Sequence, residues 1–357
     1  MNNIFKVNNS SNNDYIKKVY ERDYQMINSV IFNSLLNNYI ININYNKLYR
    51  FATEDISSYI YKLGIMNDLL SVCGSADQII NGILLGAKNI DVFDINYFAK
   101  HGLTLRLGAL KALTKEEFIH FYYSRFDNDL FEKILYYLND KDNNFWENIY
   151  NCYGKVLINN LFYENRLNAE QLVEINPYLQ DNNYEKVKEL IKDVNINFIE
   201  ADLYRLKSFI KTKKYDTINL SNIYEYLNYD RNTSIESARQ YKDFIDYLID
   251  NHLKNDGSIM IAYMYKWNKE VKNYFDNQYQ KNNKLLSRYD INKDKNLLKK
   301  GLTYQNLSYS MLYNSLKIEY EEVLTNTIIY GQNIEKKHDV ALIYRKDSYG
   351  NSKNNSG

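Results

Sequence analysis

One stretch of the chain alternates apolar runs, a turn and a helical pattern in an order that predicts α/β structure. A short apolar run, Leu69–Cys73, breaks at Gly74–Asp77, and isoleucines then recur at helical spacing until Gly86. A second apolar run, Ile90–Phe93, ends on an acid, Asp94. Strand, tight glycine turn, helix, strand and terminal acid are typical of the first half of a doubly wound α/β domain.

Five later apolar or β-branched runs predict the other strands of the same sheet. The last two are expected to close it as an antiparallel pair, whereas pyridine-nucleotide Rossmann domains end in parallel strands. A helix is predicted over 233–252, followed by a turn at Asn255–Gly257. The predicted strands are Asn197–Asp202, Asp216–Ser221, Ser258–Tyr265, Leu316–Val323 and Asp339–Arg345.

The residues between the second and third predicted strands are too many for a bare α/β unit. Asp202 ends the third strand 108 positions after Asp94, whereas a strand-helix-strand unit takes about 30 residues. The intervening residues show helical patterns, so about 80 of them are predicted to form a helical insertion. We place this insertion at 114–192 and expect it to act as a lid over the ligand-binding edge of the sheet.

Composition changes at the two ends of the chain. Both termini are rich in Asn and Ser, which predicts disorder, and helical periodicity begins soon after the first of them. The predicted organisation is a disordered segment 1–13, an N-terminal helical cap 14–64, one α/β domain over 65–113 and 193–346, the insertion 114–192, and a disordered tail 347–357.

The predicted fold class is α/β, with a Rossmann-like, seven-stranded, mostly parallel sheet, a C-terminal antiparallel hairpin and a helical insertion. Residues 50–346 resemble in this respect the class I S-adenosylmethionine (SAM) dependent methyltransferase fold. The resemblance implies that SAM, as a substrate, binds at the carboxyl edge of the sheet, where ligands bind in open α/β folds.

Composition and charge argue against several classes of partner. A net charge of +1 over 357 residues gives no global field toward nucleic acid or an anionic membrane. The chain has no run of about 18 apolar residues, so no membrane-spanning helix is predicted. The first residues lack the charged and apolar regions of a signal peptide. Cys73 and Cys152 are too few for a disulfide framework, so a cytoplasmic location is predicted, with peripheral membrane contact left open.

The glycine turn and the acid carry the strongest signal for a ligand. Gly74 permits the sharp turn, and the helix after it offers N–H groups at its N-terminus. Asp77 and the main chain of the turn are predicted to face the methionine part of SAM. Asp94, 20 positions after Gly74, sits where a carboxylate accepts from a ribose diol. Ala76 replaces the second glycine of a dinucleotide fingerprint, which weakens the case for a pyrophosphate. A purely structural turn and acid is the alternative.

Two later motifs fall in the order that a SAM site requires. Asp202 is predicted to accept from the adenine amino group, and Leu203 to pack against the ring. Leu220–Glu225 follows the fourth strand and is predicted to open onto the crevice at the carboxyl edge. The predicted cofactor-binding residues are Gly74, Ser75, Ala76, Asp77, Gln78, Asp94, Ile95, Asn96, Asp202, Leu203, Leu220 and Ser221.

A closer resemblance rests on Gly74–Gln78, Asp94–Asn96, Leu107–Leu113 with Phe118, and Leu220–Glu225. Together these segments are similar to the betaine-lipid (BtaA-like) family of SAM-dependent 3-amino-3-carboxypropyl transferases. That resemblance implies transfer of the aminocarboxypropyl group of SAM to a hydroxyl or amine. A SAM-dependent methyltransferase acting on a small molecule or lipid is the alternative, and a non-catalytic SAM-binding protein is the second alternative. Ala76 and the closing hairpin disfavour a nicotinamide-dependent oxidoreductase.

Displacement at SAM depends on alignment and on exclusion of water, so few catalytic groups are expected. Glu225 and Tyr224 are predicted candidates for a base toward a hydroxyl acceptor, with Asn222 as an orienting group. A helix start with a solvated Glu225 is the alternative. The acceptor is predicted to be a small molecule, a peptide or a lipid, and the oligomeric state is left open. No two of the four histidines have metal-ligand spacing, so no metal is predicted; His101, on the helix after Asp94, is interpreted as structural.

Overall fold

The computed structural model describes Gln25 and residues 47–123, 127–163, 167–227, 235–267, 271–273, 304–316, 318–326 and 338–347. The chain divides into two compact units. The first comprises Met1–Ser57 and Asn67–Lys211, and the second comprises Ser58–Met66 and Thr212–Gly357. The predicted disordered ends (apart from Asp347) and the predicted N-terminal cap up to residue 46 (apart from Gln25) lie outside the described residues.

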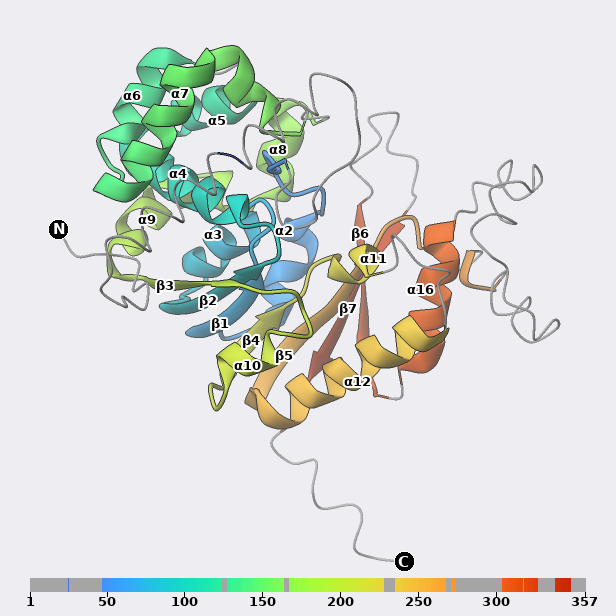
Figure 1. The fold of residues 1–357 in the computed structure, drawn as a ribbon. Coiled ribbons are helices and arrows are strands. Elements are labelled where there is room, and N and C mark those ends of the chain that lie inside the picture. The colour runs from blue at the N-terminus through green and yellow to red at the C-terminus, as the bar shows by residue number, and fades with distance from the viewer. Residues whose placement is uncertain are drawn as a thin grey trace, which may run out of the picture. The chain divides into compact units, whose positions relative to one another are not determined.

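Three parallel strands form the sheet of the first unit. Their carboxyl ends lie level at one edge, because Val72 pairs with Phe93 and Asp94 pairs with Glu200 (Figure 1). The central residues of the first two strands are buried, as expected for parallel strands that helices cover. In the order β3-β2-β1, these strands are β1 (Asp68–Val72), β2 (Asn89–Asp94) and β3 (Asn195–Glu200).

The helix that follows the glycine turn is buried along its whole length. Its apolar residues Ile79, Ile80 and Ile83 are all buried, and so are its polar residues, which is the pattern of an internal helix. Its buried polar side chains have partners: Asn81 Nδ2 donates to the main-chain oxygen of Asp77 at 2.9 Å. Beside this helix, α3 (Asp77–Leu84), the first unit has α4 (Phe98–Ala112) and the short α10 (Lys207–Ile210).

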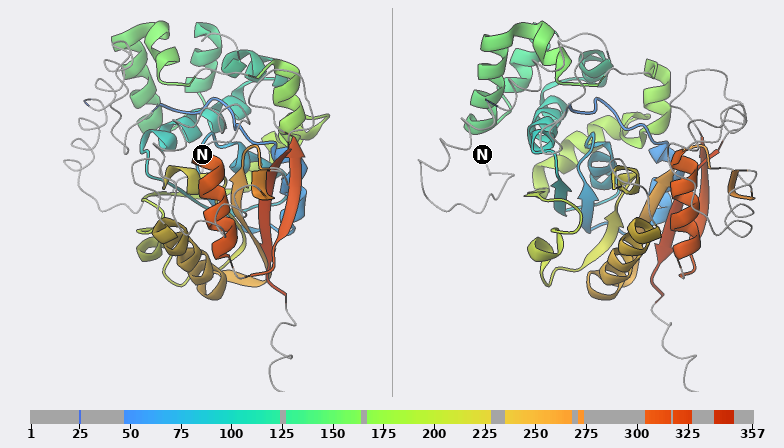
Figure 2. Two further views of the ribbon diagram at one scale, coloured as in Figure 1. Left: turned by 90° about the vertical axis from the view of Figure 1, so that its right-hand side faces the viewer. Right: turned by 45° about the vertical axis from the view of Figure 1, so that its right-hand side comes forward.

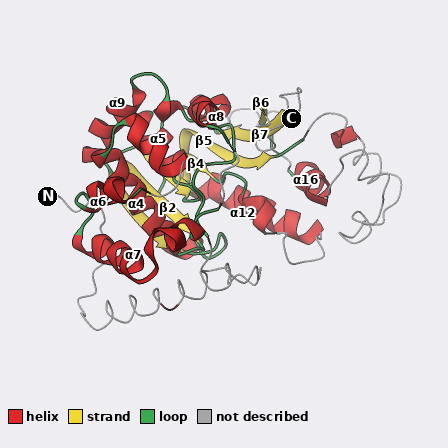
Figure 3. Ribbon diagram, turned by 90° about the horizontal axis from the view of Figure 1, so that it is seen from above, coloured by secondary structure: helices red, strands yellow, loops and turns green. Residues whose placement is uncertain are grey.

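The described part of the predicted insertion is helical. Asp127 caps one of its helices by accepting from the Leu130 main chain at 3.0 Å, and Asn168 forms a capping box with Gln171. Figure 3 shows α5, α6 and α7 grouped around α4. A Cβ at Gly108 of α4 would lie 2.6 Å from a terminal methyl group of Leu138, so a larger residue would require the Leu138 side chain to shift. The insertion contains α5 (Lys115–Tyr123), α6 (Asn128–Leu135), α7 (Asp140–Asn160), α8 (Ala169–Ile175), η2 (Pro177–Leu179), α9 (Asn183–Leu190) and η3 (Ile191–Asp193).

Four strands form the sheet of the second unit, in the order β4-β5-β7-β6. The first two are parallel, whereas the last strand of the chain runs antiparallel to both of its neighbours. Helices α12 and α16 pack against each other and lie side by side in both views of Figure 2. The elements are η1 (Ile60–Leu63), β4 (Tyr215–Asn219), α11 (Ile223–Tyr226), α12 (Ile235–Asn251), β5 (Leu253–Met264), α16 (Tyr304–Ser315), β6 (Glu321–Asn326) and β7 (His338–Arg345). The helix α2 spans Ile56–Tyr59.

The seven-stranded sheet has the order β3-β2-β1-β4-β5-β7-β6, which confirms the predicted α/β, Rossmann-like class with its closing antiparallel strands. Two boundaries were predicted wrongly. The expected turn at Asn255–Gly257 lies inside β5, where Asp256 takes a φ of +62° and the pairing register shifts. The expected strand from Leu316 begins only at Glu321, because the residues up to Ser315 still belong to α16.

Candidate functional site

The glycine turn of the first unit lies at the carboxyl end of β1. Gly74 takes a φ of +50° and Ala76 a φ of +70°, and the Ala76 N–H donates to the Cys73 carbonyl at 2.7 Å. Ala76 is the N-cap of α3, and its side chain provides no capping hydrogen bond. The first N–H groups of a helix have no partner inside it, so they point toward whatever occupies the space in front of the turn.

Asp94 ties the end of β2 to this turn. Its Oδ2 accepts from the Gly74 N–H at 3.1 Å, and its Oδ1 accepts from the Asn96 N–H at 2.8 Å. Burial raises the pKa of the Asp94 carboxyl to about 6, against the opposing effect of main-chain N–H groups of Asn96, Gly74 and Ile95. Asp94 as a whole residue is half-buried. A carboxylate has about four lone-pair sites, which leaves capacity for a ligand hydroxyl.

The two residues after Asp94 shape the start of α4. The Asn96 Oδ1 accepts from the Phe98 N–H at 3.2 Å, and its Nδ2 donates to the Lys47 carbonyl at 3.4 Å. These bonds make Asn96 a helix-capping residue. Ile95 is half-buried next to it.

Asp77 does not resemble Asp94 in its surroundings. Its carboxylate is 0% exposed and accepts from Arg106 Nη1 at 2.5 Å and from the Tyr178 hydroxyl at 2.8 Å. It also accepts from the Ala52 N–H at 2.5 Å and from the Ser75 hydroxyl at 2.8 Å. Four internal donors occupy both oxygens, so the geometry removes the reason for expecting this side chain to face the methionine part of SAM.

Gln78, the next residue, is also directed into the protein. Its side chain is 4% exposed, and its Nε2 donates to Glu54 Oε2 at 3.3 Å. At the turn, Gly74 is half-buried, whereas Ser75 and Ala76 are 7% and 1% exposed.

Asp202 follows β3 at the same edge of the sheet. Its Oδ1 accepts from the N–H groups of Tyr204 and Arg205, both at 2.9 Å, so it caps the turn before α10. The side chain is half-buried, whereas Leu203 is 2% exposed and belongs to the core. In this structure the Leu203 side chain is therefore not exposed to an adenine ring, and the predicted contact stays a prediction.

In the second unit, the second residue of the predicted motif after β4 has a strained backbone. Ser221 takes a φ of +54°, and its N–H donates to Asn219 Oδ1 at 3.0 Å. Asn222 is half-buried and donates from Nδ2 to the Tyr265 hydroxyl at 3.2 Å. Leu220 is 0% exposed and serves the core. Ligand binding by Leu220 and Ser221, and an orienting role for Asn222, stay predictions.

Tyr224 and Glu225 differ in burial, although they are neighbours in the chain. Tyr224 is 1% exposed, its hydroxyl donates to the Ser308 carbonyl at 3.2 Å, and its ring lies 5.0 Å from that of Tyr241. These contacts are those of a core tyrosine, and the catalytic role of Tyr224 stays a prediction. Glu225 is half-buried on the first turn of α11, and its role as a base stays a prediction.

Three non-glycine residues with positive φ follow the carboxyl ends of parallel strands. Ala76 follows β1 in the first unit, and Ser221 and Lys266 follow β4 and β5 in the second, with φ values of +70°, +54° and +53°. Such conformations cost on the order of 1 kcal/mol or more, and they gather at functional sites. Sequence reasoning missed Lys266, whose N–H donates to the buried Asp339 at 2.7 Å. A lysine gives no local signal for this backbone conformation.

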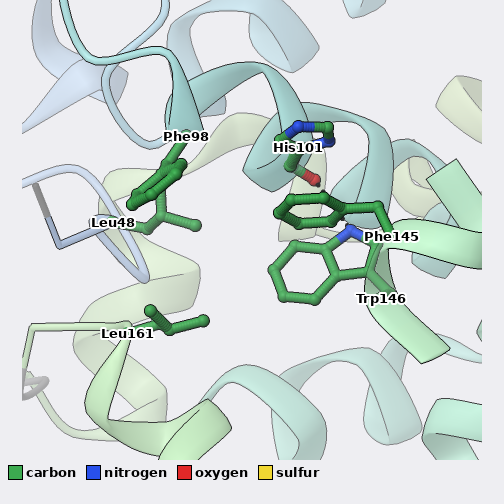
Figure 4. A pocket seen from close by; sticks show the side chains of 6 residues that line it. All are labelled: Leu48, Phe98, His101, Phe145, Trp146 and Leu161. Atoms are coloured by element: carbon green, nitrogen blue, oxygen red, sulfur yellow. Dashed lines mark hydrogen bonds between the residues drawn. The ribbon is translucent and has the colours of Figure 1, made fainter. Parts of the chain in front are cut away.

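His101 is a core residue of the first unit, as interpreted from the sequence. Its ring stacks on Phe145 with centroids 3.5 Å apart, and its Nδ1 lies 3.5 Å from Asp142 Oδ1. Figure 4 shows it at a small apolar cavity that Leu48, Phe98, Phe145, Trp146 and Leu161 also line. No group of His, Cys, Asp and Glu in the described part of the chain could hold a metal ion.

Comparisons with known proteins add little to this geometry. No protein-family model and no curated protein matches the chain. Among solved structures, one similar chain is the N-methyltransferase NodS from Bradyrhizobium japonicum WM9, with 9% identity and a TM-score of 0.32. The match covers 82% of this chain and 92% of that chain. A likeness this weak carries no argument about activity, so the fold class rests on the strand order.

Among the helices of the residues described, none is long and apolar enough to cross a membrane.

Proposed function

We propose that the protein is a SAM-dependent transferase. The observation that supports this most directly is the hydrogen bond of 3.1 Å from the Gly74 N–H to Asp94 Oδ2. It holds a half-buried carboxylate beside the N-terminus of α3, at the carboxyl edge of a parallel sheet. This is the pairing that a nucleoside with a ribose diol and a polar tail requires.

The residues of the first unit suit the parts of SAM in different ways. The accessible lone pairs of Asp94 would accept from the ribose hydroxyls, and the main chain of Gly74–Ala76 would face the methionine part. Asp202 has its Oδ1 engaged by the turn after β3, and its second oxygen is the candidate acceptor for the adenine amino group. Gly74 and Ala76 keep the turn open, because neither places a large side chain in front of α3.

The chemistry is a displacement at a carbon bonded to the SAM sulfonium. A nucleophilic oxygen or nitrogen of the acceptor forms the new bond, the carbon–sulfur bond breaks, and the sulfur keeps the electron pair. Attack at the methyl carbon releases S-adenosylhomocysteine, and attack at the γ-carbon releases methylthioadenosine. Either reaction depends mainly on alignment and exclusion of water.

The transferred group distinguishes two candidates. The class I methyltransferase fold, to which the sheet order conforms, favours methyl transfer to a small molecule or lipid. The segments Gly74–Gln78, Asp94–Asn96 and Leu220–Glu225 favour 3-amino-3-carboxypropyl transfer, and that finer proposal rests on the sequence resemblance alone. The helical insertion 114–192 is the proposed acceptor lid in both cases.

Two measurements test the proposal. Calorimetry with SAM should show binding, and the absence of binding would reject both transfers. Incubation with SAM and a cell extract should then release one nucleoside product. S-adenosylhomocysteine identifies methyl transfer, and methylthioadenosine identifies aminocarboxypropyl transfer. Binding with no product from any extract would instead support a non-catalytic SAM-binding protein.

A further inference from the structure

A buried polar cluster contacts the glycine turn through Ser75. Asp77 and Tyr178 are 0% exposed and Arg106 is 1% exposed. They come from three parts of the first unit: the first residue of α3, the short η2 turn of the helical insertion, and α4.

Asp77 is the centre of this cluster. Arg106 Nη1 and the Tyr178 hydroxyl both donate to its Oδ1, at 2.5 Å and 2.8 Å. The Ala52 N–H and the Ser75 hydroxyl donate to its Oδ2, at 2.5 Å and 2.8 Å. Through Ser75 the same carboxylate holds the turn itself, because Ser75 precedes Ala76 and its positive φ.

Arg106 is held in place by more than its ion pair. Its guanidinium lies over the rings of Phe51, Phe118 and Tyr122, 5.0 Å, 5.8 Å and 4.4 Å from their centroids. Its Nη2 donates to the main-chain oxygen of Arg50. Burial alone would lower the pKa of Arg106, but the Asp77 carboxylate keeps that pKa above its ordinary value. The arginine is therefore charged and fixed by aromatic faces.

The insertion contacts α3 on two successive helical turns, at Asp77 and Asn81. The Tyr178 hydroxyl contacts Asp77, and its main-chain N–H donates to Asn81 Oδ1 at 3.0 Å. Asn81 also donates to Asn176 Oδ1 at 3.4 Å. Both contacts involve buried polar groups whose loss leaves an unpaired partner, so the conformation of α3 and its turn depends on the insertion.

We propose that Tyr178 and Arg106 are positioning residues, which act through Asp77 to hold the glycine turn in its SAM-binding conformation. Asp77 then supports the turn and does not contact SAM. The inference rests on the proposed function for its effect on SAM, and on geometry alone for its effect on the turn. As a consequence, the insertion affects the affinity for SAM through Asp77 and the glycine turn, without contacting SAM at these residues.

The chain offers a matched pair of variants for the test. Tyr178→Phe removes one hydroxyl from Asp77. Tyr184→Phe removes a hydroxyl that donates to the Leu113 carbonyl at 3.2 Å, from a tyrosine that is also buried in the insertion. Both rings pack against Phe118, with centroids 6.1 Å and 5.6 Å away. Because the Tyr178 hydroxyl also accepts from Arg106 Nη1 at 3.4 Å, Tyr178→Phe should cost more stability than Tyr184→Phe, and only Tyr178→Phe should reach the turn.

Hydrogen exchange of a peptide that covers residues 73–78 and the Kd for SAM are measured in both variants of the full chain. In Tyr178→Phe we expect faster exchange of that peptide and SAM binding weakened about threefold to tenfold, the range for the net contribution of one hydrogen bond. In Tyr184→Phe both quantities should stay at the wild-type value. Arg106→Lys, which keeps the charge and loses the planar fork, should shift both quantities in the same direction as Tyr178→Phe.

Each other result is decisive. Unchanged exchange and affinity in Tyr178→Phe and Arg106→Lys would overturn the proposal, as would equal effects of Tyr178→Phe and Tyr184→Phe. Tighter SAM binding in Tyr178→Phe would mean that Asp77 is a direct ligand that the tyrosine competes for. If the wild-type protein does not bind SAM, the proposed function fails, and the exchange measurement still decides whether the cluster positions the turn.

Discussion

Asp77 and Asp94 lie on either side of one glycine turn, and both were predicted to meet the cofactor. The structure gives them opposite environments. Asp77 is enclosed by four donors, including a buried arginine, whereas Asp94 is half-buried and is held by main-chain N–H groups. An acid next to a turn is thus a candidate ligand-binding residue only if donors inside the protein do not already occupy all the lone pairs of its carboxylate.

The largest expected effect is on stability, at Asp77. Asp77→Ala leaves the Arg106 charge buried without its partner, so we expect the free energy of unfolding to fall by about 3–5 kcal/mol. Denaturant unfolding measures it. Adding Arg106→Met should recover part of the loss, because the uncompensated charge is gone. A loss below about 1 kcal/mol in the single variant would mean that the ion pair does not hold the fold.

The next effect is on binding, at Asp94. Asp94→Asn should weaken SAM binding by about 1.5–3 kcal/mol, the contribution of hydrogen bonds to a charged group. Calorimetry at pH 7.5 measures the change. Asp91→Asn is the control, since Asp91 lies on the same strand, is buried, and accepts from Asn197 Nδ2 at 2.7 Å. Equal affinities in the two variants would remove Asp94 from the site.

The pH dependence should separate folding from binding at the same carboxyl. The pKa of Asp94 is raised from 3.8 to about 6 in the folded protein. Its contribution to stability is therefore present below about pH 4 and is lost as the pH rises through 6. Ribose hydroxyls donate to the ionised form, so SAM affinity should change in the opposite sense and fall about tenfold from pH 7 to pH 5. Titration calorimetry across this range should show the decline in the wild type and a flatter profile in Asp94→Asn.

The smallest effect is expected at Ala76, in the turn that both acids contact. Ala76→Gly relieves a positive φ but adds freedom to the unfolded chain, so stability should change by less than about 1 kcal/mol. SAM affinity should stay within about twofold, because the main chain and both carboxylates are kept. Thermal unfolding and calorimetry measure the two quantities. A large loss of affinity would show that the Ala76 methyl group itself contacts the ligand.

The sequence predicted the strands of the sheet because their signals are local. Apolar runs mark β1 and β2, and the spacing of Gly74 and Asp94 reflects two adjacent parallel strands. The partners of Asp77 lie 25, 29 and 101 positions away in Ala52, Arg106 and Tyr178. No periodicity links such residues. Likewise α11 has only four residues, which is too short for a pattern to reveal that Tyr224 faces the core.

The contact of Tyr178 with Asp77 makes the insertion a part of the domain and not a module added to its surface. A segment that merely decorates a sheet can be trimmed or exchanged between relatives without harm to the rest. Here, trimming it would remove a donor to Asp77, remove the Phe118 ring over which the Arg106 guanidinium lies, and leave Gly108 opposite empty space where Leu138 now packs. Sheet and insertion are then expected to change together over time, and the smallest fragment that folds around the glycine turn must contain both.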